Sequence, residues 1–344
     1  MERIITYKIT ETDAGSDVHS FLRQKGYSRH MLASMKPDPE AVLLNGTHVF
    51  MRHPLTPGDT LRIRIRDDES SGTLVPSPVP FSILYEDEDL LIIDKPANEA
   101  IHPAVSHPAD TLGNGLAYYF SKKNIPFVFR CINRLDRDTT GLLIVAKNLL
   151  AASVLEQSLQ RREIHRTYLA AAEGLLPDEG TIDLPIARVD GSLILRAVDH
   201  ERGLRAVTHY RTLRRITEQE WKQTPGSRTF PGLSVLQLQL ETGRTHQIRV
   251  HLAYLGHPLA GDPLYNPNCL RRDAVLPPPG TCVPPKDENP LSLTRQALHS
   301  WKLDFTHPVT GEPMHFESPV PEDMRRLIDP DRSDRFGSFR TPSR

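Results

Sequence analysis

The hydrophobic and polar positions of residues 1–68 predict a small module of strands and helices. Residues 5–9 alternate apolar and polar side chains, as a β-strand with one buried face does. Residues 13–26 place three apolar side chains on one side of a short helix, which Gly26 ends. The same criteria predict a second helix over 28–35 with Ser28 as its N-cap, a hairpin over 41–50 around Asn45-Gly46, and a turn and strand over 57–65.

Residues 69–80 contain three prolines and little periodicity, which indicates a linker to a larger domain over 81–328. In that domain strands outnumber helices, and hairpin-like turns join them. The expected strands cover 81–96 (two strands and a turn), 142–148, 165–174 and 233–243, and the expected helices cover 111–123, 151–162 and 245–256. This order predicts an α+β fold on a mostly antiparallel mixed sheet flanked by helices.

Two segments have no pattern of this kind. Residues 266–290 are rich in proline and too long for an ordinary connection, so we expect a surface insertion there. Residues 329–344 are polar and basic, which predicts a disordered tail.

The distribution of charge is more informative than the total. The 344 residues carry a net charge of −1, which does not by itself indicate a nucleic-acid partner. However, residues 121–166 hold nine Lys/Arg against four Asp/Glu, and residues 202–251 hold nine against three. Such segments suit a surface that follows phosphates, although a solvated surface explains them equally well.

The chain shows the features of an intracellular protein. Three cysteines are too few for a disulfide framework, which favours a reducing, cytoplasmic location. The charged N-terminus has no signal peptide pattern, and no apolar run approaches the roughly 18 residues of a membrane span. We therefore expect no membrane association.

The segment "NRLDRDTTG", residues 133–141, contains two carboxylates close to two arginines. On an extended backbone Asp136 and Asp138 share a face with Arg134, whereas Arg137 points the other way. A carboxylate beside a guanidinium stays ionised, which suits a nucleophile or a base. A charged turn that caps a strand explains the same residues, and the pattern leaves open whether either carboxylate is catalytic.

Cations, histidines and one tyrosine provide further candidates. Residues 241–265 contain Arg244, His246, Arg249 and two more histidines, and Leu252 lies one helical turn after Arg249, so that both could face one pocket. Tyr168 follows a basic cluster, and an aromatic ring among arginines can hold an unstacked base, although it could equally be a core residue. The spacing of His246 and His251, and of Cys269, Cys282 and His299, matches no common zinc pattern, so no metal is expected.

Five segments in a fixed order resemble the RluA-type pseudouridine synthases, which isomerise uridine in ribosomal and transfer RNA. They are "EDEDLLIIDKPANEAIHP", "INRLDRDTTGLLIVAKN", "HRTYLA", "LETGRTHQIRVHLAYLGHPLAGDPLY" and "QALHSWKLDFTHPVTGEP". The resemblance implies the pseudouridine synthase fold over about 81–324. More loosely, residues 1–68 resemble the small RNA-binding domain of the ribosomal protein S-four type, through "YSRHML", "VLLNGTHV" and "PGDTLRIRI".

The resemblance implies a role for each candidate. Asp136, in the family's R-L-D pattern, would be the catalytic aspartate, Tyr168 would stack on the target base, and Arg249 would pair with the carboxylate. The expected substrate or RNA contacts are Arg134, Asn133, Arg137, Arg244, His246 and Leu252, of which Leu252 would form an apolar wall. Two positions depart from the commonest family pattern, Asn133 in place of histidine and Thr140 in place of serine, and they bear on the target nucleotide.

The resemblance also implies a reaction that needs no cofactor, because nothing is oxidised and no group is donated. The expected partner is RNA, with ribosomal RNA favoured over transfer RNA, and we expect a monomer. A non-catalytic RNA-binding protein on the same fold is the main alternative. A glycosidase that uses Asp136 and Asp138 is disfavoured, because residues so close in sequence would struggle to flank a sugar from opposite faces.

Overall fold

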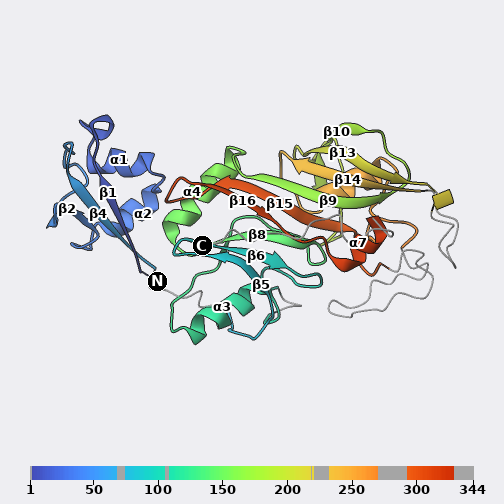
Figure 1. Cartoon of the computed structure of the whole chain (residues 1–344), viewed down its shortest axis with the longest axis horizontal. Coiled ribbons are helices and arrows are strands. Elements are labelled where there is room, and N and C mark those ends of the chain that lie inside the picture. Colours follow the sequence, from blue (N-terminus) through green and yellow to red (C-terminus); the bar gives the residue numbers. More distant parts are fainter. Residues whose placement is uncertain are drawn as a thin grey trace.

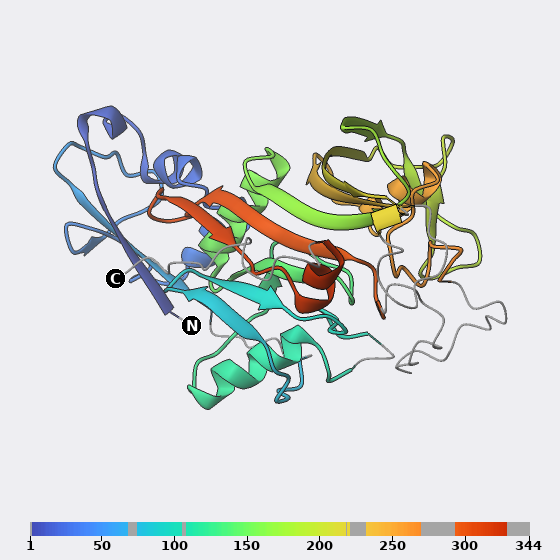
Figure 2. The same cartoon turned by 45° about the vertical axis from the view of Figure 1, so that its right-hand side comes forward.

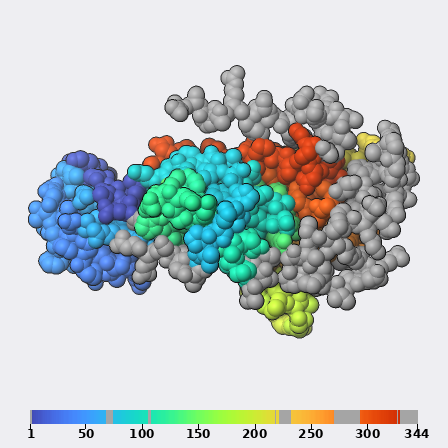
Figure 3. Space-filling view, turned by 90° about the horizontal axis from the view of Figure 1, so that it is seen from below, coloured from blue at the N-terminus to red at the C-terminus, as the bar shows by residue number. Residues whose placement is uncertain are grey.

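The computed structural model describes residues 2–67, 74–104, 108–217, 219–220, 232–269 and 293–328. The molecule is elongated, and the N-terminal module lies at one end of it, blue in Figures 1 and 3. The remaining described residues form one large sheet with its helices. No helix in the described part of the chain combines the length and the apolar character that crossing a membrane requires.

The N-terminal module consists of a four-stranded antiparallel sheet and two short helices. Its strands are β1 (Glu2–Lys8), β4 (Thr60–Arg66), β2 (Val42–Leu44) and β3 (Thr47–His48), in that spatial order. The helices are α1 (Val18–Gln24) and α2 (Arg29–Met35), and a 3-10 turn, η1 (Glu11–Asp13), precedes them. The predicted helix over 13–26 is shorter because Asp17 caps it by accepting a hydrogen bond from the Ser20 amide. The Ser28 cap and the Asn45-Gly46 hairpin are confirmed.

The large sheet contains ten strands. Eight follow the order β10-β13-β14-β9-β15-β8-β6-β5, while β16 pairs with β15 and β7 pairs with β8. Their bounds are β5 (Ser82–Glu86), β6 (Leu90–Lys95), β7 (Arg130–Cys131), β8 (Thr140–Ala146), β9 (His165–Glu173), β10 (Glu179–Asp183), β13 (Val207–Ile216), β14 (Leu233–Leu240), β15 (Leu298–Thr306) and β16 (Pro313–Glu317). Apart from the parallel contact of β15 with β8, the pairs are antiparallel, which confirms the predicted mixed sheet. Figure 2 shows the long strand β15, in red, running between the two halves of the sheet.

Both faces of β6 and β8 are covered. Leu91 and Ile93 of β6 belong to a core cluster with helix α3 (Leu112–Lys122), whereas Leu90 and Ile92 pack with helix α4 (Leu149–Gln160). This explains the continuous apolar run Leu142–Ala146 of β8, since a strand buried on both sides need not alternate. The remaining elements are helix α6 (Gln247–Tyr254), helix α7 (Glu322–Ile328) and a separate ribbon of β11 (Ile186–Arg188) and β12 (Arg196–Val198).

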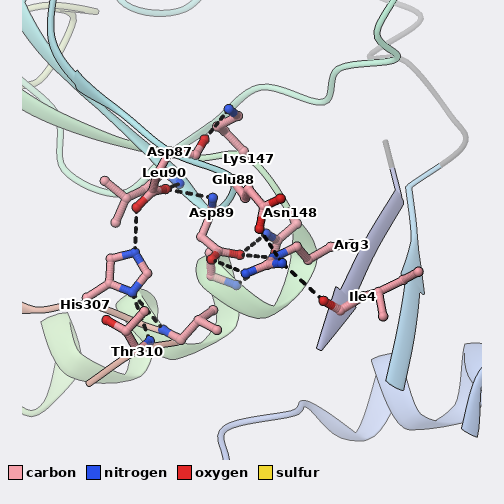
Figure 4. Close-up of polar contacts among 12 residues, drawn as sticks. Arg3, Ile4, Asp87, Glu88, Asp89, Leu90, Lys147, Asn148, His307 and Thr310 are labelled. Carbon is pink, nitrogen blue, oxygen red and sulfur yellow. Dashed lines mark hydrogen bonds and ion pairs between the residues drawn. The ribbon is translucent and has the colours of Figure 1, made fainter. Parts of the chain in front are cut away.

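The N-terminal module packs directly on the start of α4. Arg3 of β1 forms a two-bond fork with Asp89, in which Nε lies 2.8 Å from Oδ1 and Nη2 lies 2.9 Å from Oδ2 (Figure 4). The Asn148 amide also donates to Asp89, at 2.8 Å, while its oxygen caps α4. Leu150 of α4 belongs to the core of the module. A polar fork and an apolar contact therefore join the two parts of the chain.

The predicted linker and insertion are described only in part. Residues 74–80 run along α3, where the Asn114 amide donates to the Val75 carbonyl at 2.8 Å. Residues 68–73, 270–292 and 329–344 lie outside the described residues, and with them most of the predicted insertion, the predicted tail and Cys282.

Candidate active site

A cleft that is open to solvent lies where the β7–β8 loop meets β9 and the start of α6. Its charged and polar lining includes Asp136, Tyr168, His246 and Arg249, together with three arginines, Arg134, Arg166 and Arg244, which we call the arginine rim. Its apolar lining is Leu135, Leu240, Ile248 and Leu298. Six of the nine predicted site residues line this cleft, and Asn133, Arg137 and Leu252 do not.

The loop that carries Asp136 is held by buried polar groups. The Asn133 side chain accepts a hydrogen bond from the Ile144 amide at 2.9 Å and donates to the Leu142 carbonyl at 3.2 Å. Lys95, which is 1% exposed, donates to the Arg137 carbonyl at 2.8 Å. Asn133 is thus a buried residue that fixes the loop to β8, and it does not line the cleft.

Asp136 is paired with Arg249, which comes from α6, 113 positions later. Arg249 Nη1 lies 3.1 Å from Asp136 Oδ2, and its other donors bind Asp262, with Nε 2.7 Å from Oδ2 and Nη2 2.8 Å from Oδ1. Arg249 is 3% exposed and Asp262 is fully buried. Burial favours a lower pKa for Arg249, but the hydrogen bonds and charge of Asp262, with those of Asp136, outweigh it and raise the pKa. Arg249 therefore stays charged.

His246 lies beside this pair at the start of α6. Its backbone is left-handed, with φ 58° and ψ 19°, which is a strained conformation for a residue other than glycine. Nδ1 lies 2.8 Å from the Tyr265 hydroxyl, and Nε2 lies 3.9 Å from Asp136 Oδ2. Burial lowers the pKa of His246 more than Asp136 raises it, so the ring is neutral at pH 7. His246 thus offers hydrogen bonds to the cleft without adding charge.

Tyr168 of β9 forms part of the cleft wall and is 3% exposed. Its strand position pairs with Leu238 of β14 on one side and Ser300 of β15 on the other. Burial raises the pKa of Tyr168, and the charge of Arg166 partly offsets this. The hydroxyl is therefore protonated at neutral pH, and the ring offers an apolar face beside Asp136.

Leu252 and Arg137 point away from the cleft. Leu252 is fully buried in the core cluster that contains Leu116 and Leu236, so the predicted wall is instead formed by Ile248, one turn earlier on α6. Arg137 Nη2 donates to the Asn98 side chain at 2.6 Å, on the outer side of the loop. Neither residue is part of the cleft lining, although Leu252 belongs to the same core cluster as the lining residue Ile248.

Three residues of the site were not singled out by the sequence. Arg166 lines the cleft, Asp262 holds Arg249, and Tyr265 places its ring 5.1 Å from the Arg249 guanidinium carbon. Asp262 and Tyr265 stand in "GDPLY", close after α6, but no periodicity shows that a turn returns them to the helix. Arg166 lies two positions before Tyr168, which places both on the same face of β9.

One group of side chains in the described residues has the spacing of metal ligands. Asp87, Asp89 and His307 place one ligand atom each within 4.8 Å of one another. They lie at the junction with the N-terminal module, as Figure 4 shows, and none of them lines the cleft. Asp89 is already bound by Arg3 and Asn148, and His307 Nε2 donates to Asp87 at 2.8 Å, since its Nδ1 accepts from the Val309 and Thr310 amides. These side chains thus form the polar contacts of the junction.

Comparison with known proteins identifies relatives along nearly the whole chain. The sequence profile of the family described as RNA pseudouridylate synthase matches residues 89–254. An uncharacterized RNA pseudouridine synthase, YjbO, of Bacillus subtilis is 36% identical over 314 residues, covering 90% of this chain and 98% of that protein. The ribosomal large subunit pseudouridine synthase D of Xanthomonas campestris is 38% identical, with 90% and 86% covered. That of Escherichia coli K12 is 36% identical over 340 residues, with 96% and 95% covered.

Solved structures are similar in fold. Human RNA Pseudouridylate Synthase Domain Containing 1 aligns with a TM-score of 0.51 and 25% identity, covering 71% of this chain and 84% of that one. Human RNA Pseudouridylate Synthase Domain Containing 4 aligns with a TM-score of 0.50 and 22% identity. The predicted fold class is thereby confirmed.

Proposed function

Because this chain belongs to the RluA-type RNA pseudouridine synthase family, and is an isomerase that converts uridine to pseudouridine in RNA, we propose that the reaction takes place at Asp136. The observation that carries this proposal is the contact of Asp136 with Arg249 in a cleft that Tyr168 also lines. A carboxylate held beside a buried guanidinium stays ionised and aimed, as a nucleophile or base must be.

The reaction breaks the bond between ribose C1′ and uracil N1, turns the base, and joins C1′ to C5. N1 gains a proton and C5 loses one, so the product is an isomer and nothing is oxidised. Asp136 would act either as the nucleophile at C1′ or as the base toward the C2′ proton. We propose that the protein's own side chains suffice and that no cofactor takes part.

Tyr168 is suited to hold the detached base. Its ring forms a cleft wall beside Asp136, and an aromatic face can stack on any base. Since burial raises the pKa of its hydroxyl, Tyr168 would meet the substrate as a neutral phenol. We therefore assign it a stacking and hydrogen-bonding role in the free enzyme.

The arginine rim supplies positive charge at the mouth of the cleft. Arg134 and Arg244 are exposed there, and Arg166 is half-buried beside Tyr168. We propose that these side chains bind the phosphates that flank the target, while the uridine leaves its stack to reach Asp136. The N-terminal module would add a second RNA contact, as its resemblance to the S-four type suggests.

We further propose that the substrate is ribosomal RNA of the large subunit. The support is the similarity to proteins named ribosomal large subunit pseudouridine synthase D over 90% and 96% of this chain. The names of these relatives favour ribosomal RNA over transfer RNA.

Mapping of pseudouridines tests the proposal. Total RNA from a strain that lacks this protein is incubated with the wild type, Asp136→Asn or Asp138→Asn, and the modified positions are mapped in ribosomal and transfer RNA. We expect new sites in ribosomal RNA with the wild type and with Asp138→Asn, since Asp138 does not line the cleft. Asp136→Asn should give none. Activity that survives Asp136→Asn would refute the assignment, and sites confined to transfer RNA would refute the substrate.

A further inference from the structure

Asp262 stands behind the catalytic pair, at the start of a tight turn. Its Oδ1 accepts hydrogen bonds from the backbone amides of Leu264 and Tyr265 at 2.9 and 3.1 Å. Both of its oxygens also accept from Arg249. The carboxylate is fully buried, so its orientation is fixed by the turn on one side and the guanidinium on the other.

This fork leaves Arg249 one donor group for Asp136. Nε and Nη2 are taken by Asp262, and only Nη1 meets Asp136 Oδ2. Among the described residues, none donates a hydrogen bond to the second oxygen of Asp136, whose side chain is 19% exposed. One oxygen of the proposed catalytic carboxylate is held, and the other accepts no hydrogen bond from the described residues, in a residue that lines the cleft.

Tyr265 restrains the same guanidinium from another side. Its ring centre lies 5.1 Å from the Arg249 carbon, within the range of a cation–π contact. Its hydroxyl accepts from the Arg196 amide at 3.0 Å and pairs with His246 at 2.8 Å. The turn that begins at Asp262 thus fixes both the fork and the plane of Arg249.

We propose that Asp262 is a positioning residue, which holds Arg249 so that it offers Asp136 a single hydrogen bond. This inference rests on the proposed catalytic role of Asp136. An arginine buried with one carboxylate tends to form a two-bond fork with it. Without Asp262, the fork would form on Asp136 and occupy the oxygen that must reach the ribose. Asp262 takes up the fork and keeps that oxygen available.

Single-turnover kinetics of Asp262→Asn tests this role. With enzyme in excess over RNA, we expect the rate at saturation to fall on the order of 100-fold. The RNA dissociation constant should stay within about threefold of wild type, because Asp262 does not line the cleft. The reaction should still run to full extent, since slow but intact molecules convert all the RNA. A variant that is merely unstable would keep the wild-type rate at saturation and would need a higher enzyme concentration to reach it.

The chain offers a matched control in Asp323 of α7. Asp323 binds Arg295 with the same two nitrogens, Nε and Nη2, each at 2.8 Å, and it also accepts a backbone amide. Arg295 is 4% exposed, and neither residue lines the cleft. Asp323→Asn should lower the melting temperature and leave the single-turnover rate unchanged. An equal loss of rate in both variants, or a rate within threefold of wild type for Asp262→Asn, would overturn the proposal.

If Asp262→Asn folds poorly, a double variant can test the role of Asp262 in its place. Arg249→Met/Asp262→Asn removes both buried charges, and Asp136, which loses its partner, has a side chain that is 19% exposed to water. If Asp262 acts only through Arg249, the double variant should be as slow as Arg249→Met, and the two effects should not add. Additive effects would overturn the proposal. Asp136→Asn serves as reference: if it is active, the proposed function fails, whereas an inactive Asp136→Asn with a fast Asp262→Asn refutes this inference alone.

Discussion

Replacement of Arg3 by glutamine should loosen the N-terminal module from the catalytic domain. The fork from Arg3 to Asp89 joins β1 to the residue that precedes β6, and Arg3 also pairs with Glu88 beside it. Arg3→Gln keeps most of the side-chain length but removes the charge. Asp89 would then retain only the Asn148 amide as a side-chain partner in this junction.

The burial of the Arg3–Asp89 ion pair determines how much docking free energy the substitution removes. The Arg3 side chain is 19% exposed and that of Asp89 is 3% exposed. Exposed pairs contribute roughly 0–1 kcal/mol, whereas loss of one partner of a buried pair costs about 3–5 kcal/mol. Because Arg3 keeps some contact with water and Asn148 remains, we expect roughly 2–3 kcal/mol, which is about a 30- to 150-fold shift toward the undocked state.

Hydrogen exchange and calorimetry measure this shift. In Arg3→Gln, amides at the first turn of α4 should exchange faster, and the module should melt in a separate transition below that of the catalytic domain. Arg52→Gln is the control, because Arg52 pairs with Asp17 within the module and its side chain is 85% exposed. We expect it to change stability by less than about 0.5 kcal/mol. Indistinguishable melting curves for the two variants would refute the role of Arg3 in docking.

Three further changes test Arg249 and two positions outside the cleft lining, Glu99 and Gly141. Arg249→Lys should lower the single-turnover rate on the order of 100-fold, because one ammonium cannot replace three bonds to two carboxylates; a rate near wild type would remove Arg249 from the site. Burial raises the pKa of Glu99 to about 7 from 4.5, so the folded state binds a proton that the unfolded state has lost. Its stabilising contribution is therefore present below pH 4.5 and lost as the pH rises through 7, and urea unfolding of Glu99→Gln should show this dependence removed. Gly141→Ala should cost roughly 3 kcal/mol or more in urea unfolding, because φ is +104° and a Cβ would lie 2.2 Å from the Ser300 carbonyl oxygen, whereas Gly46→Ala, with open space around it, should cost about 1 kcal/mol.

The sequence pattern predicted correctly those elements that depend on residues close together in the sequence. The Ser28 cap and the Asn45-Gly46 turn depend on neighbouring residues, and both are present. Strands β13 and β15 were missed because their polar residues hide the alternation: β13 exposes basic side chains at a sheet surface, and β15 buries His299 and Ser300 through hydrogen bonds to other strands. Such burial depends on partners that are distant in the sequence.

The positions of Asn133 and Leu252, which are buried outside the cleft lining, have similar explanations. Asn133 stands in a charge-dense segment and was expected at the surface, but the loop leaves backbone groups of β8 unpaired, and the Asn133 amide satisfies them. Leu252 shares the helical spacing of Arg249, but α6 is buried from Gln247 to Leu252, so spacing cannot show which face meets the cleft. The resemblance identified Asp136, and only the tertiary structure places Asp262 behind it.

The charges of the site explain why a second buried carboxylate suits this chemistry. A buried arginine needs a counterion, and Asp136 alone could neutralise Arg249, but a full fork would engage both of its oxygens. With Asp262 in place, the group of Asp136, Arg249 and Asp262 carries one excess negative charge in a partly enclosed cleft. The arginine rim offsets this charge in the lining of the cleft, where we propose that its side chains also bind the phosphates of the RNA. The same cations would thus offset the negative charge of a carboxylate that accepts a single hydrogen bond, and they would attract the RNA to it.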